Sequence, residues 1–252
     1  MNETHASDRS HNWEDHAAWW QREFTDGADP EYREQILPLA ADLLGGFARV
    51  LEVGTGEGQV ARVVSAVGAE LVAGVDPTEN QLLAANERGG GPVYVRGSAQ
   101  LLAVRDDTFD AVVACLVFEH IDDIDQAIAE VARVLRPGGR FVLFLNHPLL
   151  QTPNSGWIDD QMLDPPEQYW RIGAYLREDS SMEEVQKGVF LRFVHRPLSR
   201  YVNTLAEHGL MLERMLEPAP PDGFLARATE YREAATIPRL LVLITRHRGP
   251  GS

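Results

Sequence analysis

The chain has 252 residues, of which 44% are hydrophobic, and its formal net charge is −15. This length and apolar content suffice for a single domain with a sizeable core. The strong negative charge repels a phosphate backbone and disfavours DNA or structured RNA as a partner. A small molecule, which meets only the local charge of its site, is the better candidate for a ligand.

The chain carries no sign of a membrane anchor, a disulfide or a zinc cluster. No apolar run approaches the roughly 20 residues of a membrane span, and residues 1–12 are too polar and mixed in charge for a signal peptide. Cys115 is the single cysteine, which excludes an intramolecular disulfide and a cysteine-based zinc cluster. We expect a soluble, cytoplasmic monomer or homodimer without a bound metal.

Short apolar runs alternate with amphipathic stretches through the first half of the chain. We expect a loose tail at 1–12, an N-terminal lid at 13–30 and a cofactor-binding half at 31–146. The apolar runs lie at 48–53, 71–75, 93–95, 109–115 and 140–145, and the clearest helical spacings at 31–44 and 123–135. This alternation predicts βαβ units, and therefore an α/β fold with a doubly wound, mostly parallel sheet.

The pattern changes after residue 146. Residues 147–196 have no clean period but many prolines, glycines and aromatics, so we predict an inserted substrate cap of short helices with a small hairpin. Regular structure resumes over 197–246, with a helix at 197–208 and strands at 210–216 and 239–245, before a tail at 247–252. The whole of 13–246 is predicted to form one domain.

The stretch "VLEVGTGEGQVA" at 50–61 places three glycines between a strand and a helix. Such a turn lets backbone N–H groups approach a ligand that a Cβ would block, either a dinucleotide pyrophosphate or a nucleoside that carries an amino acid. The spacing G-x-G-x-G differs from the G-x-G-x-x-G of dinucleotide sites. Glu52, two residues before Gly54, suits an ammonium group better than a pyrophosphate.

A second acidic residue ends the next predicted strand, in "LVAGVDP". Asp76 is placed there to accept hydrogen bonds from both hydroxyls of a ribose, a feature shared by dinucleotide and S-adenosylmethionine sites. It also fits the N-cap of the helix that starts near Thr78.

Residues 47–146 resemble the cofactor half of class I S-adenosylmethionine-dependent methyltransferases, specifically the small-molecule enzymes. The matching stretches are "LEVGTGEG", "GVDPTENQL", "GSAQLLAVRDDTFDAVV" and "LVFEHIDDIDQAIAEVARVLRPGGRF". The resemblance implies a Rossmann-like sheet of seven strands with an antiparallel last strand. It also implies S-adenosylmethionine as cofactor and methyl transfer to a small molecule as the activity.

The resemblance assigns cofactor roles residue by residue. Glu52 would support the amino group of the cofactor, Asp76 would bind the ribose hydroxyls, and Ser98 stands where the family often has Asp. The full set of expected cofactor contacts is Glu52, Gly54, Thr55, Gly56, Gly58, Asp76, Pro77, Ser98, Ala99, Cys115, Leu116 and His120. His120 is also a candidate general base.

The acceptor site is expected in the flanks of the cofactor half, because all five tryptophans lie there. Either these rings form the core of small lids, or they wall a pocket for a flat, aromatic or apolar acceptor. The candidate substrate contacts are Trp20, Trp157, Tyr169, Trp170 and His195. His147, which directly follows the predicted fifth strand, is the second candidate base, although Pro148 beside it also suits a structural histidine in a turn.

Two other functions fit parts of the sequence. The cofactor motifs do not separate methyl transfer from S-adenosylmethionine binding with other chemistry, such as isomerisation or cyclisation. A nicotinamide-dependent oxidoreductase shares the sheet type, and Glu52 and the glycine spacing argue against it.

Overall fold

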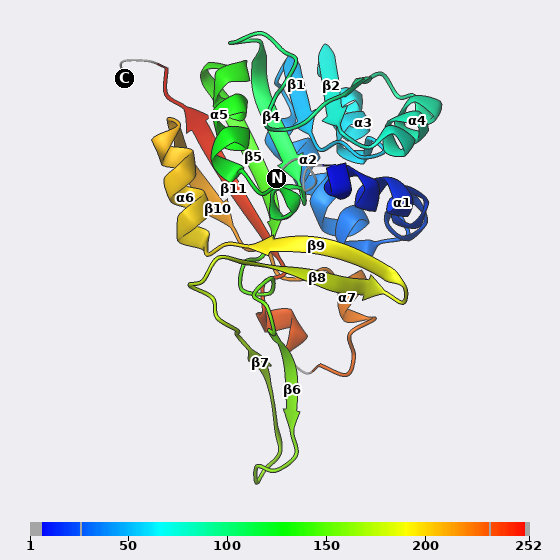
Figure 1. The fold of residues 1–252 in the computed structure, drawn as a ribbon, viewed down its shortest axis with the longest axis vertical. Helices are drawn as coiled ribbons and strands as arrows, with labels where there is room; N and C mark the ends of the chain where they lie inside the picture. The colour runs from blue at the N-terminus through cyan, green and yellow to red at the C-terminus, as the bar shows by residue number, and fades with distance from the viewer. Residues whose placement is uncertain (1–6, 26, 232, 250–252) are drawn as a thin grey trace.

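The computed structural model describes residues 7–25, 27–231 and 233–249, with side chains from Trp13 onward. A seven-stranded sheet forms its centre, in the order β10-β11-β5-β4-β1-β2-β3 (Figure 1). The strands are β1 Arg49–Val53, β2 Leu71–Asp76, β3 Val93–Arg96, β4 Phe109–Cys115, β5 Leu135–Asn146, β10 Leu210–Leu216 and β11 Leu240–His247. Only β11 pairs antiparallel to its neighbours in this sheet, so the predicted topology is confirmed.

Helices cover both faces of the sheet because successive residues of the central strands point to opposite sides. Leu51 packs in the cluster formed with α5 (Ile124–Val134) and α6 (Leu198–Glu207). Val50, its neighbour, packs in the cluster formed with α2 (Leu37–Leu44) and α3 (Gln59–Ala66). A further helix, α4 (Glu79–Arg88), lies beside β2 and β3. The two-sided burial explains why these strands read as continuous apolar runs.

The N-terminal segment is helical, which corrects part of our expectation. The predicted tail falls partly on residues 1–6, which lie outside the described residues, but α1 spans Ser7–Phe24. A tail over residues 7–12 was therefore wrong. The polar composition misled us because α1 is stabilised along one stripe at helical spacing, where Trp13, Ala17 and Trp20 follow one another. The π-helical segment η1 (Tyr32–Ile36) then leads into α2.

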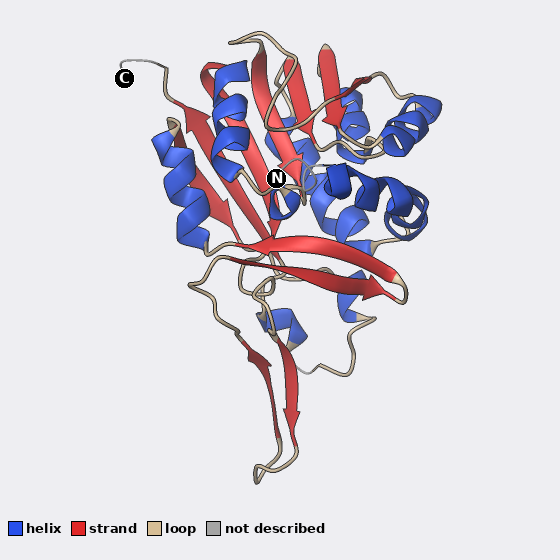
Figure 2. Ribbon diagram, viewed as in Figure 1, coloured by secondary structure: helices blue, strands red, loops and turns tan. Residues whose placement is uncertain are grey.

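The segment predicted as a helical cap consists of two antiparallel hairpins, so its helices were predicted wrongly. They are β6 (Gly156–Asp160) with β7 (Glu167–Arg171), and β8 (Asp179–Gln186) with β9 (Val189–His195). Along β9 every second residue is buried, which is a strand period and not a helical one. Figure 2 shows the strands of both hairpins below the helices that flank the main sheet.

The remaining elements are short. They are η2 (Phe118–His120), α7 (Asp222–Leu225) and η3 (Ala234–Thr236). Within the described part of the chain, no helix has both the length and the apolar character that crossing a membrane requires.

Candidate functional site

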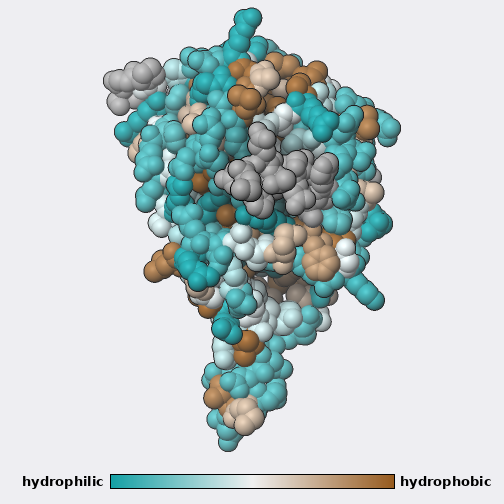
Figure 3. All heavy atoms as spheres, viewed as in Figure 1, coloured by the Kyte–Doolittle hydropathy of each residue, from teal (hydrophilic) through white to brown (hydrophobic). Residues whose placement is uncertain are grey.

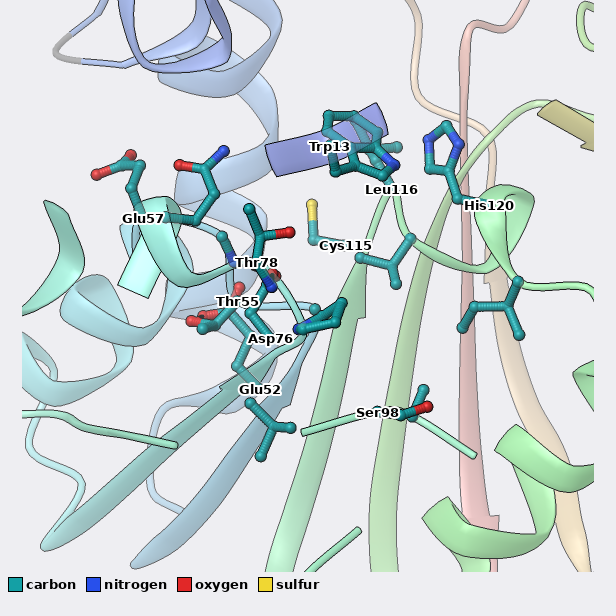
Figure 4. Close-up of a pocket in the computed structure, with 18 of the residues that line it drawn as sticks. Trp13, Glu52, Thr55, Glu57, Asp76, Thr78, Ser98, Cys115, Leu116 and His120 are labelled. Atoms are coloured by element: carbon teal, nitrogen blue, oxygen red, sulfur yellow. Dashed lines mark hydrogen bonds between the residues drawn. The ribbon is translucent and has the colours of Figure 1, made fainter. Parts of the chain in front are cut away.

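A cavity of about 520 Å³ lies at the carboxyl ends of β1, β2 and β4. The loops that follow these strands line it, together with residues 97–100 and side chains of α1 and η1 (Figure 4). In a doubly wound sheet the carboxyl edge is where ligands bind. The sequence therefore predicted the edge correctly.

Glu52 lies under the cavity floor and is held by the loop that follows it. Its Oε2 accepts hydrogen bonds from Thr55 Oγ1 at 2.6 Å and from the Ala61 backbone N–H at 2.9 Å. Burial, together with the nearby Asp76 and Glu57, raises the pKa of Glu52 to about 8 despite these two hydrogen bonds. A buried carboxyl of this kind gains most from a cation placed beside it.

The three glycines of the loop serve different purposes. All have positive φ, where only glycine is free of strain. A Cβ on Gly54 would meet Val117, and one on Gly58 would meet Tyr94, so both positions are required for packing within the protein. A Cβ on Gly56 would meet nothing within 4 Å. Gly56 is thus the position where the bare backbone faces open space in the cavity.

Asp76 fixes the same loop from the neighbouring strand. Its Oδ2 accepts from the Gly56 N–H and its Oδ1 from the Thr78 N–H, each at 2.8 Å. Each carboxylate oxygen retains further lone-pair capacity for a ligand hydroxyl. Burial raises the pKa of Asp76 above its ordinary value, with the two backbone hydrogen bonds acting in the opposite direction.

The charge of the cavity selects against a pyrophosphate. Among the described residues that line it there are four acidic side chains and no lysine or arginine. The acidic residues are Glu52, Glu57, Asp76 and Asp122. Glu57 is paired with Arg62 and Arg88, and Asp122 with Arg192. The lining therefore offers an anionic ligand no basic group, whereas the carboxyls of Glu52 and Asp76 gain from a cation. This observation weighs against a nicotinamide dinucleotide and favours a ligand with a sulfonium and an ammonium group.

Aromatic side chains of the N-terminal segment form a further part of the cavity wall. Trp13 and Trp20 from α1 line the cavity, and their ring centroids lie 5.6 Å apart in an edge-to-face arrangement. Tyr32 of η1 lines it as well, with its ring centroid 6.0 Å from that of Trp20. Thr25, just after α1, donates a 3.0 Å hydrogen bond to buried Glu57 and ties the helix to the glycine loop.

His120 completes this wall from the segment after β4. Its ring lies edge-on to Trp13, with centroids 4.9 Å apart (Figure 4). Burial lowers the pKa of His120 to about 4. The imidazole is therefore neutral at physiological pH.

Comparison with known proteins agrees with this geometry. The methyltransferase domain family matches residues 51–143. A demethylmenaquinone methyltransferase of Thermobifida fusca is 31% identical over 174 residues, which are 63% of this chain and 71% of that protein. The chain belongs to the S-adenosylmethionine-dependent methyltransferase family.

Further relatives of the chain support its assignment to this family. The crystal structure of an S-adenosylmethionine-dependent methyltransferase from Mesorhizobium loti matches with a TM-score of 0.72 and 27% identity, covering 87% of this chain and 98% of that one. A ubiquinone biosynthesis O-methyltransferase of Rhizobium rhizogenes is 37% identical over 106 residues, which are 40% of this chain. The matched segments span 42% to 49% of the length of the first curated relatives.

Membership in the methyltransferase family implies S-adenosylmethionine as the cofactor, and the cavity fits it. Open space lies over Gly56, acidic groups line the same cavity, and its described lining has no lysine or arginine. Of the cofactor contacts that we expected, all but one line the cavity; these are Glu52, Gly54, Thr55, Gly56, Asp76, Pro77, Ser98, Ala99, Cys115, Leu116 and His120. The exception is Gly58, which caps α3 and lies against Tyr94.

Of the five expected acceptor contacts, one reaches the cavity and four do not. Trp20 lines it, whereas Trp157, Tyr169, Trp170 and His195 are absent from its lining. Trp157 and Trp170 pair across β6 and β7, and Trp157 stacks on Tyr231 with centroids 4.9 Å apart. These two rings therefore pack within the hairpin. This matches the interpretation in which the tryptophans form the core of small lids.

His147 emerges at the end of β5 as expected, but its ring is engaged elsewhere. Nε2 lies 2.8 Å from Glu217 Oε1, and Nδ1 accepts from the Leu149 N–H at 3.1 Å. His195 is buried, with Nε2 2.8 Å from the carbonyl of Tyr175. Neither ring lines the cavity, and the contacts of both suit structural histidines in turns.

Among the lining residues that were not predicted as site residues, Trp13, Tyr32 and Glu57 contribute most to the walls described above. Trp13 lies one heptad before Trp20, a spacing that puts both on one helical face and that could have paired them. Tyr32 and Glu57 gave no such signal, because a tyrosine in an amphipathic helix and an acid among glycines are both common surface features.

Proposed function

We propose that this protein transfers a methyl group from S-adenosylmethionine to a small acceptor with a flat, aromatic or apolar body. The cofactor, when bound, supplies a methyl group that its positively charged sulfur already activates. The protein's remaining task is to hold the acceptor in line with that methyl group and to exclude water. The observation that carries the proposal is the aromatic wall of Trp13, Trp20 and Tyr32 on the same cavity as Glu52 and Asp76.

The two walls of the cavity divide the work. On one side Glu52, Asp76 and the backbone at Gly56 suit the amino acid and ribose parts of the cofactor. On the other side the indole rings offer apolar area for an acceptor, and their faces attract a sulfonium by cation–π interaction. Relatives named for ubiquinone and menaquinone biosynthesis agree with a ring-shaped acceptor.

Methyl transfer is preferred over other chemistry on S-adenosylmethionine because the acceptor wall adjoins the cofactor residues within one cavity. The test uses purified protein, methyl-labelled S-adenosylmethionine and a panel of small phenols, aromatic amines and quinols. We expect one product heavier by a single methyl group, detected by mass spectrometry with stoichiometric S-adenosylhomocysteine. An acceptor that is isomerised or cyclised without gaining the label would support the alternative function.

Trp20→Ala is expected to raise the acceptor KM by about tenfold or more, since a buried aromatic truncation costs about 2–4 kcal/mol. The affinity for S-adenosylhomocysteine, measured by titration calorimetry, should change much less. Trp157→Ala is the matched control, because it removes the same ring from the β6–β7 hairpin outside the cavity. An equal rise of the acceptor KM in both variants would contradict the assignment of the wall.

A further inference from the structure

His120 has its tautomer fixed by a backbone contact from another element. Its Nδ1 lies 2.8 Å from the carbonyl oxygen of Arg192 in β9. A carbonyl oxygen can only accept a hydrogen bond, so Nδ1 carries the proton and donates it. The neutral ring therefore presents a lone pair at Nε2.

This lone pair is left open. Among the described residues Nε2 has no hydrogen-bond partner, and it is not among the polar atoms that are fully shielded from solvent. Since His120 lines the cavity, the open acceptor belongs to the cavity wall. Aromatic neighbours hold the ring on both sides, with Trp13 at 4.9 Å and Phe193 at 4.6 Å between centroids.

The ionisable groups next to His120 are directed to residues other than its ring. Arg192, whose carbonyl holds Nδ1, directs its guanidinium to Asp122 at 2.5 Å. Glu119, the preceding residue, is buried and turned toward Asn146 in β5, whose backbone and side-chain N–H groups donate to its Oε1. The ring is thus set between rings and a carbonyl, and burial keeps its pKa low.

We propose that the methyl acceptor is a protic ring compound, a phenol or aromatic amine, whose O–H or N–H donates to Nε2 of His120. The inference rests on the proposed function and narrows its acceptor class. The acceptor's ring lies against Trp13 and Trp20, and the hydrogen bond to Nε2 aims the oxygen or nitrogen lone pair at the methyl group. An O- or N-methylated ring is the product.

The proton follows the new bond. The acceptor's oxygen or nitrogen forms the bond to the methyl carbon, the electron pair of the broken carbon–sulfur bond remains on sulfur, and the acceptor's proton passes to Nε2. A phenol with a pKa of about 10 keeps its proton against this weak base before transfer. Once methylated, the same oxygen is cationic and strongly acidic, so a weak base suffices. His120 later releases the proton to water.

A site of this kind discriminates by hydrogen bonding. An acceptor analogue without an O–H or N–H would leave Nε2 desolvated and unpaired, a cost that corresponds to about tenfold or more in affinity. The comparison of 1-naphthol with 1-fluoronaphthalene isolates this effect, because the two share one aromatic body and a similar size but differ in the donor. In the tests below, 1-fluoronaphthalene is therefore the compound compared with 1-naphthol.

The experiment measures the affinity of both compounds by calorimetry on protein saturated with S-adenosylhomocysteine. We expect wild type to bind 1-naphthol about tenfold more tightly, and His120→Phe to bind both alike. Nitrogen-15 NMR of the imidazole should show an unprotonated Nε2 that shifts with 1-naphthol only.

Equal affinities in wild type, an unmoved Nε2 signal, or binding of neither compound would overturn the proposal. Failure of S-adenosylhomocysteine itself to bind would instead overturn the proposed function. His120→Phe is accepted as folded when it binds S-adenosylhomocysteine like wild type, and Phe193→Leu serves as a second variant that loosens the ring without removing the acceptor.

Discussion

Glu52 is uncharged for most molecules at neutral pH without a ligand, since its pKa lies near 8. A folded-state pKa above the ordinary value of 4.5 means that the free protein loses stability as the pH rises from about 4.5 to about 8. A cation bound beside Glu52 lowers that pKa again. Binding of S-adenosylmethionine should therefore release a proton.

Calorimetry of S-adenosylmethionine binding at pH 6.5 in two buffers of different ionisation enthalpy measures this release. Wild type should release up to one proton, and its affinity should rise from pH 6 to pH 7. Glu52→Gln keeps an oxygen for Thr55 and Ala61 but has no proton to release, so its binding heat should be the same in both buffers. Buffer-independent heat in wild type would contradict the role of Glu52.

Gly56→Ala tests whether the cofactor binds in the open space over the glycine loop. The substitution should weaken S-adenosylhomocysteine binding by about tenfold or more, since a methyl group forced into a filled site costs about 1–3 kcal/mol. Gly46→Ala is the matched control, because Gly46 also has positive φ and open space around its Cβ position but lies outside the cavity.

The two variants share the backbone strain of about 1–2 kcal/mol for a left-handed residue. The melting temperature should therefore fall similarly in both variants. Only their affinity for S-adenosylhomocysteine, measured by calorimetry, should differ. Similar cofactor affinities for both variants would show that the space over Gly56 is not used.

The individual site residues differ in how well the sequence could predict their roles. Glu52, Gly56 and Asp76 lie at the ends of strands that the apolar runs already define, so a local pattern places them at the ligand edge. The open Nε2 of His120 could not be foreseen, because it depends on the carbonyl of Arg192 in a different element. For His147 the sequence predicted the position at the end of β5, but it could not predict that Glu217, far along the chain, contacts its Nε2.

At the scale of elements, α1 is held over the cavity by few polar contacts. Glu14 accepts hydrogen bonds from the backbone N–H groups of Glu79 and Asn80, at 2.8 and 2.9 Å, and so caps the N-terminus of α4. This contact joins the helix that carries Trp13 to the helix that follows Asp76. We expect it to help retain bound cofactor.

Glu14→Ala should accelerate dissociation of S-adenosylhomocysteine about fivefold, since a lost N-terminal cap costs about 1 kcal/mol. Stopped-flow fluorescence can follow it, because Trp13 and Trp20 line the cavity. Glu23→Ala, on the same helix but paired with the exposed neighbour Arg22, is the control and should leave the rate unchanged. Identical dissociation rates in the two variants would show that the contact of Glu14 with α4 does not retain the cofactor.

The segment whose structure was predicted least well is the expected cap over residues 147–196. The alternation of buried residues along β9 exists in the sequence as Leu191, Phe193 and His195, but prolines and scattered aromatics around it obscure the period. The turn at Gly188, with φ of 81°, is the local signal that could have indicated a hairpin. In β6 and β7 the rings find their partner in Tyr231, beyond the reach of any local pattern.

For the whole molecule, the sheet was predictable because its strands are buried on both faces and the βαβ order leaves few topologies. The β6–β7 hairpin is different, since it projects from the body (Figure 1) and rests on few contacts. Its tip carries exposed Met162 and Leu163. The projecting part of the molecule is largely hydrophilic, with a few apolar side chains on this face (Figure 3). Nothing in its local sequence distinguishes this arm from a cap over the site.

Replacing residues 157–170 by Asn-Gly tests that distinction directly. Gly156 and Arg171 are paired in register, so a two-residue turn can join them without moving the rest of the chain. We expect unchanged affinity for S-adenosylhomocysteine, because no residue of this segment lines the cavity, and a modest fall in melting temperature from the lost stacking on Tyr231. Loss of cofactor binding in a variant that still unfolds cooperatively would show that the arm supports the site, and a raised acceptor KM alone would make it an acceptor contact after all.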